Sequence, residues 1–266
     1  MSYDFSVSSV SLTRLWIVSL MGAVACGFDG VATGPNAASS GGTSDAGPAG
    51  GDGGVGPTDD GGAQADGEVI FLDAAGGPEL TLTSGAPAPQ VDLEQEGTVA
   101  WIHWGTTTND EESLNEKASA VSALLTYSVT GSSDIRTYED NFTSFRWTNG
   151  TPMATQGGTR NGVYSKTGKP KFHLNRVVGV EPQRWVIYAG AFKCKALLSV
   201  TLGTGPTAQT ATATIDNADH GYVRYVIDHR AKAPATPLAV TWELTDAHDP
   251  NNSNVTLAAA TLAPLP

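Results

Sequence analysis

The sequence predicts an all-β protein, an antiparallel β-sandwich or jelly roll, that follows a disordered N-terminal linker. Three observations predict this fold class. Only 16% of the 266 residues are charged, while glycine is frequent at 31 residues. From Glu68 onward, short apolar runs bounded by Gly, Pro, Asn or Asp recur, most within about 8–15 residues of the next. Several of these runs alternate apolar and polar residues, which indicates strands with one buried face.

These patterns divide the chain into three segments. Residues 1–25 are expected to be a signal peptide, 26–67 a Gly/Ala/Asp-rich tether, and 68–266 one β-sandwich domain. A short helical turn is expected only within Glu111–Leu125, around Leu114 and Lys117. The expected strands are Val69–Asp73, Leu80–Thr83, Val91–Leu93, Val99–Trp104, Ala123–Thr130, Ile135–Tyr138, Thr143–Trp147, Gly162–Ser165, Lys171–Leu174, Trp185–Phe192, Ala196–Leu202, Ala211–Ile215, Tyr222–Asp228, Leu238–Leu244 and Val255–Thr261.

The strand Val99–Trp104 carries large rings on both faces. Alternation places Trp101 and His103 on one face and Ile102 and Trp104 on the other. Both faces are therefore expected to be covered, either in the middle of a sandwich or at the rim of a ligand site.

The N-terminus has the features of an export signal. Arg14 precedes an apolar run, Leu15–Ala25, that is too short to span a bilayer but suits the core of a signal peptide. The run ends Ala23-Val24-Ala25-Cys26-Gly27, which resembles a bacterial lipobox, although Leu is commonest where this chain has Ala23. The resemblance implies that Cys26 is acylated and becomes the mature N-terminus. The alternative is ordinary secretion after Ala25, which leaves Cys26 free to pair with Cys194.

The tether and its charge exclude some partners. Between Cys26 and Glu116 there are 16 acidic residues and no Lys or Arg. Too few apolar side chains occur in residues 27–67 to offset the entropy of ordering them, so a flexible tether with ends ~35 Å apart is expected. The chain has no basic run, which argues against nucleic acid as a partner.

A family resemblance rests on short motifs that occur in order along the domain. They are Val91-Asp92-Leu93, Gly97–Gly105, Lys117, Phe145–Pro152, Asn161–Tyr164, Tyr188–Ala191, Leu198–Leu202 and Val255–Leu262. Together they are similar to a galactose-binding-like β-sandwich module of secreted bacterial proteins. The resemblance implies a jelly roll, with an accessory role beside carbohydrate-active or surface modules and no defined activity.

Aromatic residues are the candidate ligand-binding site. A tryptophan offers an apolar face to a sugar, and His103 offers a polar tip for hydroxyls. The alternative for each of these rings is the hydrophobic core, and the alternative for Asn149 is turn chemistry with Gly150. The candidates are Trp101, His103, Trp104, Trp147, Asn149, Tyr164 and Trp185, with Arg160 as a further polar contact.

The loop from Asp246 to Asn254 is rich in oxygen ligands. Asp246, Asp249 and Asn251 are candidate ligands for a structural calcium ion, because calcium takes six to eight oxygens. The alternative is a polar hairpin loop with Asx-turns. No other cofactor is expected.

Catalytic motifs are absent from the sequence. It contains no Gly-x-Ser-x-Gly, no His-Glu-x-x-His and no Cys/His zinc spacing. The expected function is a non-enzymatic lipoprotein, anchored to the membrane through Cys26, in the outer membrane or on the bacterial cell surface. It would display a module that binds carbohydrate or another envelope component. The alternatives are a structural or protein-interaction module without a small ligand and, less favoured, a hydrolase.

Overall fold

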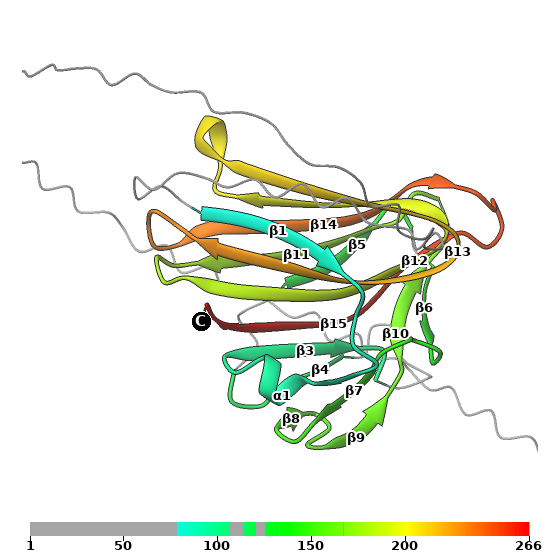
Figure 1. Ribbon diagram of the computed structural model, residues 1–266, viewed down its shortest axis with the longest axis horizontal. Helices are drawn as coiled ribbons and strands as arrows, with labels where there is room; N and C mark the ends of the chain where they lie inside the picture. Colours follow the sequence, from blue (N-terminus) through cyan, green and yellow to red (C-terminus); the bar gives the residue numbers. More distant parts are fainter. Residues whose placement is uncertain (1–78, 107–113, 121–125, 133, 167, 266) are drawn as a thin grey trace, which may run out of the picture. The chain divides into compact units, whose positions relative to one another are not determined.

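β-Strands dominate the protein (Figure 1). The computed structural model describes residues 79–106, 114–120, 126–132, 134–166 and 168–265. The predicted all-β, antiparallel fold class is confirmed. In chain order the elements are β1 (Glu79–Gly85), β2 (Gln90–Asp92), α1 (Leu93–Glu96), β3 (Ala100–Trp104), β4 (Leu114–Lys117), β5 (Thr126–Thr130), β6 (Ile135–Tyr138), β7 (Ser144–Trp147), β8 (Gly150–Thr151), β9 (Gln156–Thr159), β10 (Gly162–Ser165), β11 (Lys171–Val178), β12 (Gln183–Leu202), β13 (Gln209–Arg230), β14 (Thr236–Ala247) and β15 (Asn254–Pro264).

The strands of the described residues form two sheets. A 12-stranded sheet runs in the order β5-β11-β14-β12-β15-β3-β4-β8, with β13 and β1 continuing from β12, and β10 and β6 continuing from β15. The second sheet has the order β2-β7-β9. Its β2–β7 pair is parallel, which departs locally from the antiparallel pattern that the sequence predicts.

The long hairpin of β12 and β13 connects the two parts of the large sheet. The first half of β12 pairs with β15, and its second half pairs with β14. The halves meet at Lys193, which has a positive φ of 48° and lies at a register shift. A bulge changes the alternation of faces by one residue. Ile187 before it and Leu198 after it therefore both point into the same core.

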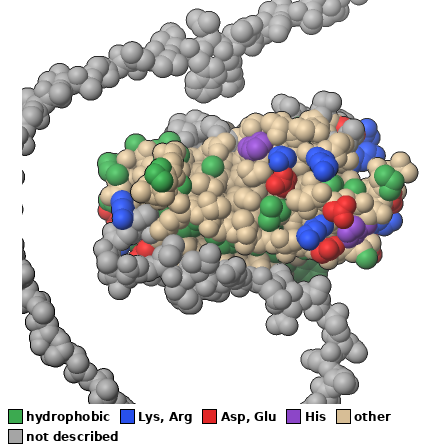
Figure 2. Space-filling model, turned by 90° about the horizontal axis from the view of Figure 1, so that it is seen from above, with side chains coloured by type: hydrophobic (Ala, Val, Ile, Leu, Met, Phe, Trp, Pro, Cys, Tyr) green, Lys and Arg blue, Asp and Glu red, His purple; other side chains and the backbone are tan. Residues whose placement is uncertain are grey.

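The large core is enclosed by the curled 12-stranded sheet. Trp104, Trp185 and Trp242 are fully buried in it, with Phe172 and Tyr225. Burying one such side chain stabilises the fold by roughly 1.5–3 kcal/mol, so these rings are major contributors to stability. Outward side chains on the second half of β12 and the first part of β13 include Ser199, Thr201, Thr210, Thr212 and Thr214, and Figure 2 shows a face on which uncharged surface predominates.

A smaller core lies on the opposite face of β12 and β15. There Trp101, Phe145, Trp147 and Tyr188 pack together beneath the small sheet and α1. Asp92 caps α1, since its carboxylate accepts hydrogen bonds from the backbone N–H groups of Glu94 and Gln95. The strand β3 separates the two cores, which confirms that both of its faces are covered.

Two local predictions about secondary structure were wrong. Leu114–Lys117 is the strand β4, where a helical turn was expected, because burial alternates along it and places Asn115 and Lys117 inside. The Lys117 ammonium donates to the carbonyls of Gly97 and Thr98 and pairs with Glu94 at 2.8 Å. In addition, the expected strands Trp185–Phe192 and Ala196–Leu202 form one long strand, β12. Ala211–Ile215 and Tyr222–Asp228 likewise form one long strand, β13.

Several predictions lie outside the described residues. They are the signal peptide, Cys26, the tether, the strand Val69–Asp73, residues 123–125 of the strand Ala123–Thr130, and residues 111–113 and 121–125 of the expected helical stretch. Within the described residues, no helix combines the length and apolar character that crossing a membrane requires. Cys194 is a free, buried cysteine whose Sγ donates to the Asn254 carbonyl, and burial raises its pKa to about 11.

Candidate functional site

The structure places the predicted tryptophan platform in the interior. Trp101 and Trp147 are 2% exposed and belong to the smaller core, while Trp104 and Trp185 are 0% exposed and belong to the larger one. No face of these rings is available to a sugar. The prediction that these tryptophans bind a ligand is therefore wrong, because the rings are packed in the hydrophobic cores on the two faces of the sheet.

His103 is also a core residue. Its ring is 0% exposed and lies 5.2 Å from the Trp147 ring and 5.3 Å from the Phe145 ring, between centroids. Burial lowers the His103 pKa to about 3, so the imidazole is neutral. It cannot serve as the exposed polar tip that the sequence suggested.

Asn149 and Arg160 do not line the pocket described below. Asn149 is half-buried in the turn before β8, where its amide donates to the Ser119 hydroxyl. Arg160 is exposed, and its carbonyl accepts a hydrogen bond from the Asn141 N–H. The contacts of both residues are therefore with other parts of the chain, away from the pocket.

The candidate calcium loop is a hydrogen-bonded turn. The Asp249 carboxylate accepts hydrogen bonds from the backbone N–H groups of Asn251 and Asn252 and from the Asn252 amide. The Lys193 ammonium lies 3.6 Å from it. These donors satisfy the carboxylate, and the described residues contain no cluster of three or more His, Cys, Asp or Glu side chains suited to a metal. The calcium prediction gains no support from this geometry.

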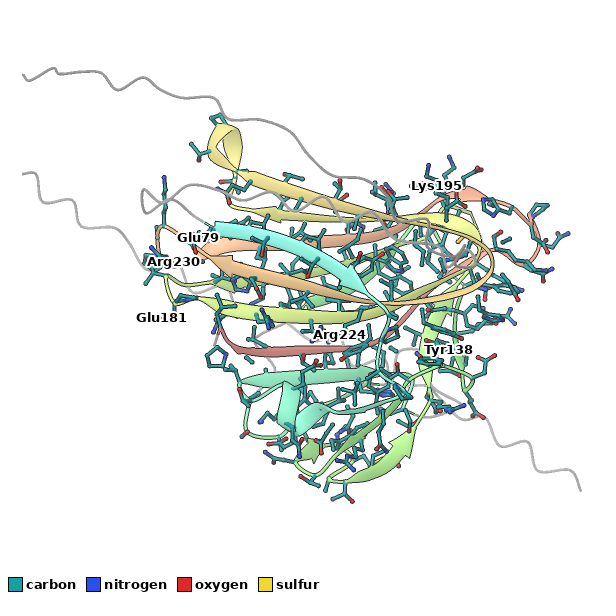
Figure 3. The ribbon with its side chains drawn as sticks, in the orientation of Figure 1. Glu79, Tyr138, Glu181, Lys195, Arg224 and Arg230 are labelled. Atoms are coloured by element: carbon teal, nitrogen blue, oxygen red, sulfur yellow. The ribbon has the colours of Figure 1, made fainter. Side chains whose placement is uncertain are left out.

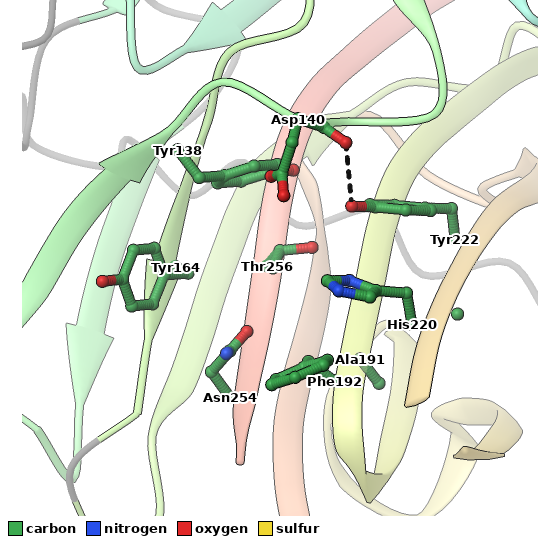
Figure 4. Close-up of a pocket in the computed structure, with 10 residues that line it drawn as sticks. Tyr138, Asp140, Tyr164, Ala191, Phe192, His220, Tyr222, Asn254 and Thr256 are labelled. Atoms are coloured by element: carbon green, nitrogen blue, oxygen red, sulfur yellow. Dashed lines mark hydrogen bonds between the residues drawn. The ribbon is translucent and has the colours of Figure 1, made fainter. Parts of the chain in front are cut away.

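A pocket of about 160 Å³ opens on the large sheet, on the face that also carries the smaller core (Figure 4). Adjacent strands supply its lining. The register aligns Tyr164 of β10, Thr256 of β15, Gly190 of β12 and Tyr222 of β13 in one row across the sheet. Asn254, Phe192 and His220 form the next row. The lining is therefore a continuous patch that the sheet itself assembles.

The walls of the pocket are aromatic. Phe192 and His220 lie with ring centroids 4.3 Å apart, and His220 stacks against Tyr222 at 6.1 Å. On the other side Tyr138 and Tyr164 meet edge to face at 6.4 Å. Figure 3 places Tyr138 toward the opposite end of the strands from Glu79 and Arg230. Four of these five rings are half-buried and His220 is exposed, so each retains accessible surface, unlike the core tryptophans.

Polar atoms stand among the rings. The Tyr222 hydroxyl donates to the Asp140 carbonyl at 3.2 Å, and the Asn141 amide donates to the Tyr138 hydroxyl at 2.8 Å. Burial, reinforced by the Asp140 charge, raises the pKa of Tyr222 to about 12, and burial raises the Tyr138 pKa as well. Both phenols therefore stay neutral at ordinary pH.

Thr256 forms part of the floor. It is 8% exposed, and its Oγ1 has no hydrogen-bond partner by distance and angle among the described residues, although it lies close enough to the Tyr138 phenol to lower the pKa of that group slightly against the larger effect of burial. A buried hydroxyl that lacks a partner costs about 1–3 kcal/mol. Figure 4 shows this hydroxyl facing the hollow between Tyr138 and His220. A ligand atom placed there would satisfy it.

Of the predicted site residues, Tyr164 alone lines this pocket. Neither His220 nor Asp140 lies in a sequence motif, so the sequence did not point to either as a ligand-binding residue. The sequence does show that Tyr222 and His220, two residues apart, share one face of a strand. Which residues of β12 and β15 lie beside them follows only from the strand register.

No family model matches the chain, and no curated protein matches it. The solved structures to which the chain is partly similar include the following three. TmCBM61 in complex with β-1,4-galactotriose has a TM-score of 0.35 and 9% identity over 52% of this chain and 88% of that one. The enzymatically active domain of tailspike protein 4 from bacteriophage CBA120 has a TM-score of 0.32 and 10% identity over 53% and 20% of the two chains. A family 16 carbohydrate-binding module has a TM-score of 0.27 and 14% identity over 40% and 79%.

Proposed function

We propose that this protein is a non-catalytic binding module whose pocket holds one saccharide ring. The observation that carries the proposal is the pocket itself, in which aromatic walls surround a buried Thr256 hydroxyl with no hydrogen-bond partner of normal geometry. A pyranose has apolar C–H faces and a rim of hydroxyls, and aromatic side chains with a few placed polar groups match both. Asp140 is the one carboxylate among the lining residues, so the pair of carboxylates that a glycosidase uses does not occur there.

The size of the pocket supports a single ring. Sites for larger organic ligands enclose about 300–1,000 Å³. The volume of about 160 Å³ here is below that range. Tyr138 and Asp140 bound the hollow on one side, and Phe192 and Asn254 bound it on the other (Figure 4). The ligand we propose is therefore one residue of a glycan.

The proposed setting is the bacterial cell envelope. This part of the proposal rests on the sequence, in which Cys26 follows an export signal and precedes the Gly/Ala/Asp-rich tether. Lipid on Cys26 would hold the pocket near a membrane surface while the tether allows it to reach glycans. Incorporation of radiolabelled palmitate that is lost in Cys26→Ser would support this anchor, and undiminished incorporation would refute it.

Glycan-array binding followed by titration calorimetry tests the saccharide proposal. We expect Tyr164→Ala to abolish binding, because it removes a wall of the pocket. Phe142→Ala is the matched control: Phe142 is 50% exposed and lies outside the lining. The control variant should bind as the native protein does, and thermal unfolding should show that both variants remain folded.

A different result would favour the structural alternative. If the folded protein bound no glycan on a broad array, and saccharides left its melting temperature unchanged, the pocket would not be a saccharide site. The module would then be a structural or protein-interaction unit of the envelope.

A further inference from the structure

Asp140 places a negative charge at the proposed saccharide pocket. It lies in the loop after β6, and its backbone carbonyl is held by the Tyr222 hydroxyl at 3.2 Å. Figure 4 shows the Asp140 carboxylate directed into the hollow, above Thr256 and between Tyr138 and Tyr222. None of the ion pairs found among the described residues includes Asp140. Its charge is therefore available to a ligand.

Two basic side chains close to Phe192 have other partners. The Lys193 ammonium lies over the Phe192 ring at 5.2 Å from the centroid and pairs with Asp249. His248 lies 3.2 Å from the Asp216 carboxylate. Among the residues that line the pocket, His220 is the one with a basic side chain.

The walls of the pocket also favour a cation. Tyr138, Tyr164, Phe192 and Tyr222 contribute aromatic rings, and a ring face attracts a positive charge within about 6 Å. The phenols of Tyr138 and Tyr222 are neutral donors and acceptors, so they do not cancel the Asp140 charge. A carboxylate beside several aromatic rings is the environment that suits a protonated amine.

We propose that the pocket selects a saccharide that carries a protonated amino group, with the ammonium bound by the Asp140 carboxylate. This inference rests on the proposed saccharide function and assigns the ligand class of the same site. The sugar ring would lie over Gly190 and Thr256, where a ring hydroxyl can donate to Thr256 Oγ1. Neutral sugars would use the same walls and floor without the charge-assisted hydrogen bond.

Titration calorimetry of the purified full chain tests the selectivity. The probes are glucosamine and galactosamine, their N-acetylated forms, and glucose and galactose, at a pH at which the sugar amine is protonated. We expect at least one amino sugar to bind about tenfold more tightly than its neutral and N-acetylated counterparts, which is the size of a partly exposed charge-assisted hydrogen bond. The preference should weaken at high salt, because salt screens an exposed charge pair.

Two variants distinguish a specific contact from general charge. Asp140→Asn should remove the amino-sugar preference while neutral sugars still bind. Glu139→Gln makes the same change of charge one residue away, at an exposed side chain outside the lining, and should keep the preference. A preference that survives Asp140→Asn, or that Glu139→Gln abolishes equally, would overturn the assignment to Asp140.

The remaining outcomes separate the two proposals. Equal binding of amino and neutral sugars by the native protein would overturn the selectivity and leave the saccharide function standing. Binding of choline as tight as that of the amino sugar would mean that the pocket recognises a cation without the sugar ring, and would overturn the inference. No binding of any saccharide would refute the proposed function itself.

Discussion

Gly190 and Thr256 lie directly opposite each other on β12 and β15, at the floor of the pocket. A Cβ at position 190 would stand 2.6 Å from Thr256 Oγ1 and 2.9 Å from the Gly221 carbonyl oxygen. The missing side chain therefore keeps the Thr256 hydroxyl accessible. The pocket between the side chains of these strands therefore stays open because position 190 has no side chain.

Gly190→Ala is expected to close the floor and abolish saccharide binding. The added methyl group meets backbone at Gly221 and so should also cost about 1–3 kcal/mol of stability, as overpacking usually does. Calorimetry and urea denaturation measure the two effects. Gly179→Ala is the control, since a Cβ there meets nothing within 4 Å, and it should change neither quantity. Native-like binding by Gly190→Ala would contradict the role of this floor.

Thr256→Val is expected to weaken saccharide binding about tenfold without loss of stability. Valine keeps the shape of threonine and removes a buried hydroxyl whose one neighbouring polar group, the Tyr138 phenol, is not in hydrogen-bond geometry with it, so folding loses little. Thr261→Val is the matched control on the same strand. The Thr261 hydroxyl donates to Glu96 at 3.1 Å, so this change should cost about 1 kcal/mol of stability and leave binding unaffected. Equal destabilisation by both changes would show that Thr256 has a structural partner.

Glu96→Gln is expected to destabilise the protein by about 1–3 kcal/mol. The Glu96 carboxylate accepts hydrogen bonds from the Tyr188 hydroxyl and pairs with Arg224 at 2.8 Å, so α1 is tied to β12 and β13. An amide cannot replace all of these bonds and leaves the Arg224 charge without its partner. Denaturation in urea measures the loss. The exposed Glu181→Gln serves as control and should behave like the native protein.

Stability is expected to fall as the pH drops below about 6.5. Burial lowers the pKa of His103 to about 3 and that of His229 to about 4, where an unfolded histidine has a value near 6.5. Between these values the unfolded chain binds more protons than the folded one, so each histidine should contribute a loss of about 1.4 kcal/mol per pH unit. Above pH ~6.5 both histidines are neutral in the folded and in the unfolded chain, so they cause no loss of stability there.

Urea unfolding at a series of pH values measures this dependence. His103→Leu removes one titrating group from the core, so its stability should fall less steeply with decreasing pH, whatever its stability at neutral pH. An unchanged slope in His103→Leu would contradict the assignment to His103.

The strands were largely predictable from local sequence, while the site was not. Alternation located β3, β7, β14 and most others within a few residues, because burial of one face imposes a period of two on the side chains. The same reasoning failed at Leu114–Lys117, since a buried lysine that bonds three oxygens does not look apolar in sequence. It also split β12 in two, because the bulge at Lys193 interrupts the alternation without ending the strand.

Sequence alone determined the all-β fold class and the covered faces of the strand with Trp101 and Trp104. Both follow from side-chain periodicity, which is a local property of the chain. Only the tertiary structure decided that these rings are core and that Tyr164, Thr256, Gly190 and Tyr222 form one row. Those residues come from four strands far apart in sequence, and hydrogen-bond register, which is a property of the whole sheet, brings them together.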